Sequence, residues 1–167
     1  MKRIISKIGY VYRVKISDTT QRYFQYVAND ITQLNSSVIR VFKSVYPITE
    51  APDLNRIIED EVDFYAHVVI RWGIEMGLWE KIGKISEVGM VDILFRQSED
   101  RRVKSGEKMI EVSEKWWVWK INEKMKYVGK LEKASGKTEN GAVKNPIDVV
   151  ERMRTGKYKY KEPGFDC

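Results

Sequence analysis

The chain has 167 residues, of which 43% are apolar and 32% are charged, a composition typical of one globular domain. Its single cysteine, Cys167, excludes an intramolecular disulfide and a metal cage of thiolates, and an unpaired thiol favours a reducing compartment. The N-terminus lacks the apolar core of a signal peptide, and no run approaches the roughly 20 apolar residues of a membrane span. We therefore expect a cytoplasmic protein that does not associate with a membrane.

The net charge of +6 is spread unevenly along the sequence. Three stretches, 2–15, 120–137 and 152–161, are basic, and such a surplus attracts polyanions. The segment from Glu50 to Asp63 is the opposite, because it holds six acidic residues and only one basic residue, Arg56. This pattern predicts a molecule with one acidic patch on an otherwise basic surface.

The first elements in chain order are predicted strands. Ile8 to Ile16 alternates apolar and polar residues, which is typical of a half-buried strand. The turn at 17–20 leads into a second strand, Arg22–Ala28, so the two strands are expected to form a hairpin. Val38–Phe42, rich in β-branched and aromatic residues, predicts a third strand.

In the middle of the chain we expect a short helix and a long strand. Asp53 is a candidate N-cap for a helix that ends near Asp60, and the alternation from Val62 to Trp72 predicts the strand. Three glycines in the segment Gly73–Gly83 disfavour a helix by about 1 kcal/mol each relative to Ala. This segment is therefore predicted to be irregular, with a short strand around Trp79.

The C-terminal half adds three predicted strands, at 92–96, 115–121 and 127–131, with loops at 98–106 and 134–141. A helix follows, with Asn145 as N-cap, Pro146 at its first position and Gly156 at its end. Its inner face is expected to hold Ile147, Val150 and Met153. The sequence thus predicts one α+β, β-rich domain over residues 1–167, with two short helices and a loosely ordered tail from about residue 157. About seven strands would form an antiparallel sheet or a small, partly open barrel.

Candidate catalytic residues are few. His67 is the single histidine, which disfavours a zinc site, and the alternation places it with Asp63, Tyr65 and Arg71 on one strand face. That face is expected to be a solvated outer surface, although the same residues could in principle cleave a phosphodiester. Ser135-Gly136-Lys137-Thr138 resembles the end of a phosphate-binding loop, but Leu131 stands where that motif needs its first glycine. We expect no catalytic residue, no metal and no cofactor.

The tryptophans of the strand at 115–121 are candidate core or binding residues. Alternation puts Trp117 and Trp119 on one face, predicted to be core, and Trp116 on the other. Because tryptophan is enriched at binding surfaces, Trp116 is retained as a candidate partner-binding residue.

Three stretches together resemble the immunity protein 26 family of bacterial polymorphic-toxin systems. They are Lys7–Tyr12 with the hairpin that follows, Tyr26–Asp30 leading to Val38–Phe42, and Trp79–Gly83. The resemblance implies a cytoplasmic protein that neutralises a cognate toxin by binding it, without catalysis.

The expected function is therefore toxin neutralisation through protein binding. An acidic patch would suit the basic cleft of a nucleic-acid-cleaving toxin, so the candidate contact residues, besides Trp116, are Asp53, Glu59, Asp60, Glu61 and Asp63. The alternative is a small basic β-barrel that binds nucleic acid.

Overall fold

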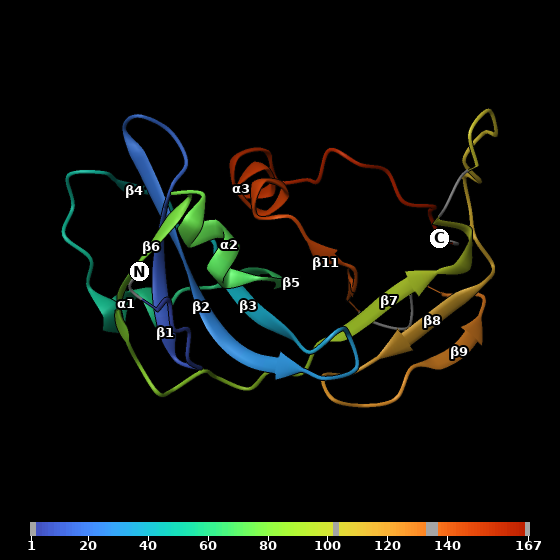
Figure 1. Ribbon diagram of the computed structural model, residues 1–167, viewed down its shortest axis with the longest axis horizontal. Coiled ribbons are helices and arrows are strands. Elements are labelled where there is room, and N and C mark those ends of the chain that lie inside the picture. Colours follow the sequence, from blue (N-terminus) through green and yellow to red (C-terminus); the bar gives the residue numbers. More distant parts are fainter. Residues whose placement is uncertain (1–2, 102–103, 133–136, 166–167) are drawn as a thin grey trace.

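The computed structural model describes residues 3–101, 104–132 and 137–165. Its strands form two sheets that follow one another along the longest axis of the molecule (Figure 1). The helix α3 and the chain that follows it run across the top of this view, from the larger sheet towards the smaller one. In the described part of the chain, no helix is long and apolar enough to cross a membrane.

The larger sheet has seven strands in the order β11-β5-β3-β2-β1-β6, with β4 pairing beside β2. All of its pairings are antiparallel except that of β11 with β5. The bounds are β1 Tyr10–Lys15, β2 Thr20–Asp30, β3 Ser36–Phe42, β4 Tyr46–Pro47, β5 Val62–Val68, β6 Trp79–Lys84 and β11 Val143–Lys144.

The smaller sheet has four strands in the order β10-β7-β8-β9, in which β10 pairs with β7 in parallel. The bounds are β7 Leu94–Ser98, β8 Trp116–Trp119, β9 Lys126–Gly129 and β10 Thr138–Asn140, and a single 3-10 turn, η1, covers Glu99–Arg101. Only two residues separate β10 in this sheet from β11 in the larger sheet, so the segment 138–144 joins the two sheets.

The expectation of an α+β, β-rich fold is confirmed, but both sheets are mixed and, in the residues described, no barrel closes. The described residues form eleven strands and three α-helices, where about seven and two are predicted. The strands that the sequence does not reveal, β4, β10 and β11, are two or three residues long, too short to show an alternating pattern. Lys137 and Thr138 of the phosphate-loop-like motif lead into β10 and not into a helix, while Ser135 and Gly136 lie outside the described residues.

The predicted strand 62–72 is wrong in its second half. Strand β5 ends at Val68, and Ile70–Glu75 forms the helix α2 inside the region predicted to be extended and irregular. Gly73 is required there for packing, because a Cβ atom at this position would lie 2.0 Å from the indole ring of Trp79. The prediction counted the helix propensity of the glycine and could not include this tertiary contact.

The helices α1 (Leu54–Ile58) and α3 (Pro146–Thr155) begin where they are predicted. Asp53 accepts hydrogen bonds from the backbone N–H groups of Asn55 and Arg56, and Asn145 accepts from that of Ile147. The inner face of α3 differs from the prediction, because Val149, Val150 and Met153 are buried whereas Ile147 is exposed. Val150 and Met153 are buried as predicted, and Val149 takes the place expected for Ile147 in the apolar stripe.

Helices cover both faces of the larger sheet. On one face, Phe24 and Phe64 pack with Trp79 and with residues of α2 and α3 in the main core. On the other face, Tyr23 and Phe42 pack against Ile57 of α1.

A third cluster joins the two sheets: Val27 and Val38 of the larger sheet contact Phe95 and Trp119 of the smaller one. Gly141, between β10 and β11, permits this packing, because a Cβ atom there would lie 2.0 Å from the ring of Trp119.

The chain after α3, predicted to be loosely ordered, contacts both sheets as far as residue 165. The ring of Tyr158 lies edge-on to Phe64, with ring centroids 6.4 Å apart. Glu162 pairs with Arg96 of β7, and the ring of Phe165 lies edge-on to Trp116, at 5.7 Å. Cys167 lies outside the described residues.

Candidate functional site

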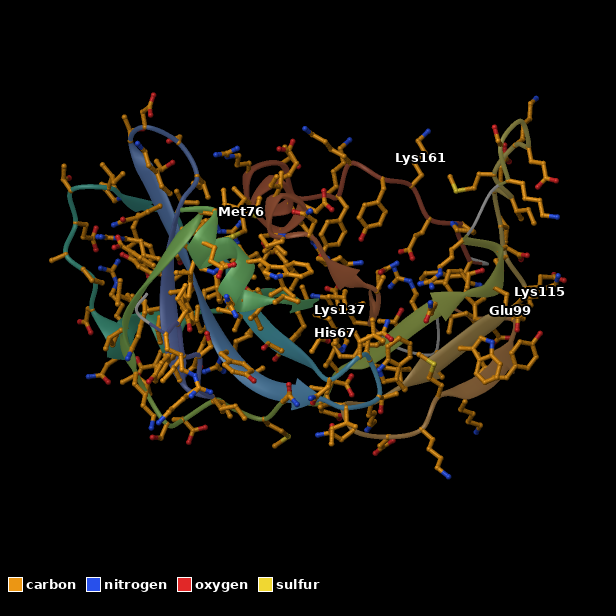
Figure 2. The ribbon with its side chains drawn as sticks, viewed as in Figure 1. His67, Met76, Glu99, Lys115, Lys137 and Lys161 are labelled. Carbon is orange, nitrogen blue, oxygen red and sulfur yellow. The ribbon has the colours of Figure 1, made fainter. Side chains whose placement is uncertain are left out.

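His67, the candidate general base, is fully buried and does not lie on a solvated face. The prediction is wrong because the smaller sheet covers this face of β5: the His67 ring lies 4.2 Å from the ring of Phe95, between centroids. Its Nε2 is 2.7 Å from Oδ2 of Asp30, which is also fully buried. Figure 2 shows His67 at the seam between the two sheets. Arg71, predicted to share its face, lies on α2 and pairs with Glu75.

The Asp30–His67 pair is organised to stay as a carboxylate and a neutral imidazole. Burial lowers the pKa of His67 more than its contact with Asp30 raises it. Burial alone would raise the pKa of Asp30, but hydrogen bonds from His67, Asn122 and Trp119 together bring the pKa below its usual value. This arrangement connects the two sheets from a position that is closed to solvent.

Three of the five acidic candidates have structural roles. Asp53 caps α1, and Asp60 accepts hydrogen bonds from the backbone N–H groups of Ser44 and Glu61. Asp63 is half-buried and lies 2.7 Å from the guanidinium of Arg22, which is itself buried. Their carboxylates are therefore engaged by the chain's own donors.

The other two acidic candidates lie on the surface. Glu61 is exposed and pairs with Lys43 at 2.9 Å, and this contact raises the pKa of Lys43. Glu59 is exposed at the end of α1. The structure thus brings the five residues into one region around α1 and the start of β5, as predicted, but the local charge is smaller than the sequence suggests.

Trp116, the candidate partner-binding tryptophan, is fully buried. Its Nε1 donates a hydrogen bond to the backbone oxygen of Ser113, at 2.7 Å, and its ring packs with Leu131 and Phe165. The prediction is wrong because the C-terminal segment covers the face of the smaller sheet that a single-strand pattern leaves open.

Trp117 is the tryptophan that reaches the surface. It shares a strand face with Trp119, as predicted, but the larger sheet covers only the Trp119 end of that face. Trp117 is half-buried and lies edge-on to Tyr127 of β9, with ring centroids 5.3 Å apart, and Tyr127 is 50% exposed. The prediction that Trp117 is core is therefore wrong.

A shallow hollow of about 400 Å³ lies beside this pair. Its lining includes Trp117, Met125 and Gln97, with Glu99 and Arg101 at its margin. Trp117 Nε1 donates to Glu99 at 2.9 Å, which fixes the indole ring. Figure 2 shows Glu99 and Lys115 at this end of the smaller sheet. We call the surface formed by Trp117, Tyr127 and Met125 the aromatic face.

Comparisons with known proteins found no match, whether with family models, with curated proteins or with solved structures. The functional argument therefore rests on the geometry of the chain.

Within the described residues, no group of three or more His, Cys, Asp or Glu side chains is placed to hold a metal ion. The aromatic face offers a rigid, partly apolar surface with hydrogen-bonding groups at its margin. Such a surface suits noncovalent recognition of another macromolecule.

Proposed function

We propose that the protein is a non-enzymatic binding protein that neutralises a bacterial toxin in the cytoplasm, and that the aromatic face is its contact surface. The observation that carries the proposal is the pair of half-buried Trp117 and exposed Tyr127 beside Met125. Tryptophan, tyrosine and methionine are enriched at protein interfaces, where a few such residues supply most of the binding energy. The resemblance to immunity proteins supports a toxin as the partner.

The charge around the aromatic face favours an acidic segment of the partner. The hairpin that carries it, residues 114–130, contains five lysines and two glutamates. Lys124 and Lys126 are exposed, and Lys115 is exposed although it pairs with Asp100 at 3.7 Å. A basic rim around an aromatic centre speeds the association with an acidic partner and leaves the close packing to the rings.

The position of the aromatic pair also favours docking. Strand β9 is the last strand of its sheet, so one of its edges is not paired within the described residues. An exposed edge next to two aromatic rings can accept both backbone and side-chain contacts from a partner.

The test is the affinity for the toxin, measured by titration calorimetry with Trp117→Ala and Tyr127→Ala. Each change should weaken binding by a factor of about 30 or more, the size of an interface hot spot. Trp72→Ala is the matched control, because Trp72 is a 52% exposed tryptophan on α2 in the larger sheet region. Equal affinity for all three variants and the wild type would refute this contact surface.

A second candidate function, binding of single-stranded nucleic acid, is favoured by one observation. Exposed aromatic rings on a basic hairpin can stack on bases while lysines contact phosphates. Titration of tryptophan fluorescence with a random oligonucleotide distinguishes the two. Tight binding that weakens steeply with salt and disappears in Trp117→Ala would favour nucleic acid over the toxin.

A further inference from the structure

A second hollow, of about 380 Å³, lies where the two sheets meet the chain after α3. Strands β7 and β10, helix α3 and the tail after it form its wall. The wall includes Arg96, Glu139, Asn140, Arg152, Tyr158 and Glu162. Lys137, also in the wall, is labelled in Figure 2 near the seam between the sheets. The volume falls in the range of ordinary small-molecule sites.

Positive charge exceeds negative charge around this hollow. Arg152 forms two hydrogen bonds with Glu139, at 2.8 and 3.1 Å, and Arg96 pairs with Glu162. These two pairs use both carboxylates of the wall. The ammonium groups of Lys137 and Lys157 in the wall remain, as does that of Lys144, which contacts Asn140 of the wall, and no ion pair among the described residues neutralises any of them.

Lys144 is the most unusual of the three, because its side chain is buried and the residue is only 3% exposed. Its Nζ donates to Oδ1 of Asn140 in the wall of the hollow. It also lies 4.8 and 5.0 Å from the ring centroids of Tyr158 and Tyr160. These neutral groups only partly replace water, and burial lowers the pKa of Lys144 to about 7.

Two further donors of the wall have no acceptor among the described residues. The hydroxyl of Tyr158 and Nε of Arg96 are both buried, and neither has an acceptor for its proton there. A buried donor without an acceptor costs about 1–3 kcal/mol, so groups of this kind are commonly found where a ligand binds. Together with Lys144, they are donors from three different elements around one hollow.

We propose that this hollow binds a small molecule that carries a phosphate monoester, with the phosphate between Lys144, Tyr158 and Arg96. A phosphate offers several acceptor oxygens and up to two negative charges, which matches several separate donors and uncompensated lysines better than one carboxylate does. The stacked rings of Tyr158 and Tyr160, 5.1 Å apart, form the side of the hollow against which the rest of the ligand would lie. This site is separate from the aromatic face and does not depend on the proposed toxin partner.

The site should bind anions more tightly at lower pH. An anion stabilises the protonated form of Lys144, so binding requires a proton once the pH rises above about 7. The groups that face this ammonium are His67 of β5, Arg96 of β7, Glu139 of β10, Arg152 of α3, and Tyr158, Tyr160 and Glu162 of the tail. The pKa of Arg152 is raised by its contact with Glu139 and that of His67 is lowered by burial, so neither group changes its charge above pH 7 and Lys144 dominates the change.

Titration calorimetry with inorganic phosphate, phenyl phosphate, sulfate and acetate tests the proposal. We expect saturable binding of phosphate and sulfate, tighter binding of phenyl phosphate, and the weakest binding of acetate. Sulfate keeps its charge between pH 6 and 9. A loss of sulfate affinity over this range therefore reports the deprotonation of Lys144 and not a change in the charge of the ligand.

Tyr158→Phe, which removes only the hydroxyl, should weaken phosphate binding about ten-fold, the effect of one hydrogen bond to a charged group. Lys144→Met should abolish the pH dependence of sulfate binding, and Trp72→Ala, outside the lining of the hollow, should change nothing. Circular dichroism checks the fold of each variant. If Lys144→Met does not fold, the phosphate affinity of Tyr158→Phe tests the proposal without it. The proposal is overturned if no anion binds saturably, or if Tyr158→Phe binds phosphate as the wild type does.

Discussion

The indole Nε1 of Trp119 donates a hydrogen bond to Oδ2 of Asp30, at 3.1 Å, and so connects β8 of the smaller sheet to the end of β2 in the larger one. The same carboxylate accepts from the backbone N–H groups of Asn122 and Thr32, both at 3.0 Å, and faces His67 at 2.7 Å. Asp30 is therefore the polar centre of the junction between the sheets, inside the apolar cluster around Phe95.

Asp30→Ala is expected to lower the free energy of unfolding by about 3–5 kcal/mol, because it leaves several buried donors without an acceptor. Urea denaturation followed by circular dichroism measures the effect. Asp18→Ala is the control, since Asp18 is fully exposed in a turn and its ion pair with Lys15 should contribute little to stability. A loss of less than 1 kcal/mol in Asp30→Ala would contradict the assigned role.

Acid should destabilise the protein first through His67. The folded state keeps this ring neutral, with its pKa below the ordinary value of 6.5, while the unfolded chain takes up a proton below that pH. The unfolded state then binds more protons, so the free energy of unfolding falls as the pH drops from 6.5 towards 5, by up to about 1.4 kcal/mol per pH unit. Asp30, whose pKa is also lowered, adds its own loss only when the pH falls below about 3.8.

His67→Gln tests this assignment, since glutamine can still donate to Asp30 but does not titrate. Urea denaturation at several pH values between 5 and 6.5 should give a nearly flat profile for the variant and a slope for the wild type. Equal slopes would show that another group is responsible.

Trp116 and Trp117 are neighbours whose replacement should lower the stability by very different amounts. Trp116→Ala should cost about 3–5 kcal/mol, because it removes a buried ring that packs with Leu131 and Phe165. Trp117→Ala should cost much less, since this ring is half-buried and its contacts lie at the surface. Thermal melting of both variants measures the two losses of stability. A larger loss for Trp117→Ala than for Trp116→Ala would contradict the described packing.

The sequence predicts elements that have strong local signals. The hairpin of β1 and β2, the cap of α1 at Asp53 and the limits of α3 at Asn145 and Gly156 follow from alternation and capping residues alone. Local patterns also place Trp117 and Trp119 on one face of β8. These predictions succeed because the interactions involved lie within a few residues of one another.

The remaining features depend on contacts between distant segments. Gly73 is helical because Trp79 packs on it, His67 is buried because β7 and β8 cover β5, and Trp116 is buried because Phe165 lies on it. A pattern along one strand cannot show which face a second sheet or a C-terminal segment will cover. The hollow beside Lys144 could not be predicted for the same reason, since β7, β10, α3 and the tail all contribute to its wall.

The acidic region around α1 can be tested separately from the aromatic face. Glu59→Lys should lower the association rate with a toxin only if this region contacts it, and the effect should shrink as salt is added. Glu59 is the appropriate residue, because Asp53, Asp60 and Asp63 accept hydrogen bonds that hold the local structure, and their replacement would disturb it. Stopped-flow mixing at low and high salt measures the rate, and we expect a change of less than two-fold, as the aromatic face is the proposed contact.

The most direct test of the proposed function is protection of growing cells. The protein is co-expressed in bacteria with the product of the gene immediately upstream of its own, and growth is measured for the wild type, for Trp72→Ala and for the double change Trp117→Ala with Tyr127→Ala. We predict that the upstream product stops growth, that the wild type and Trp72→Ala restore it, and that the double variant does not, although it melts within a few degrees of the wild type. Growth arrest that the wild-type protein fails to relieve, or full protection by the double variant, would contradict the account.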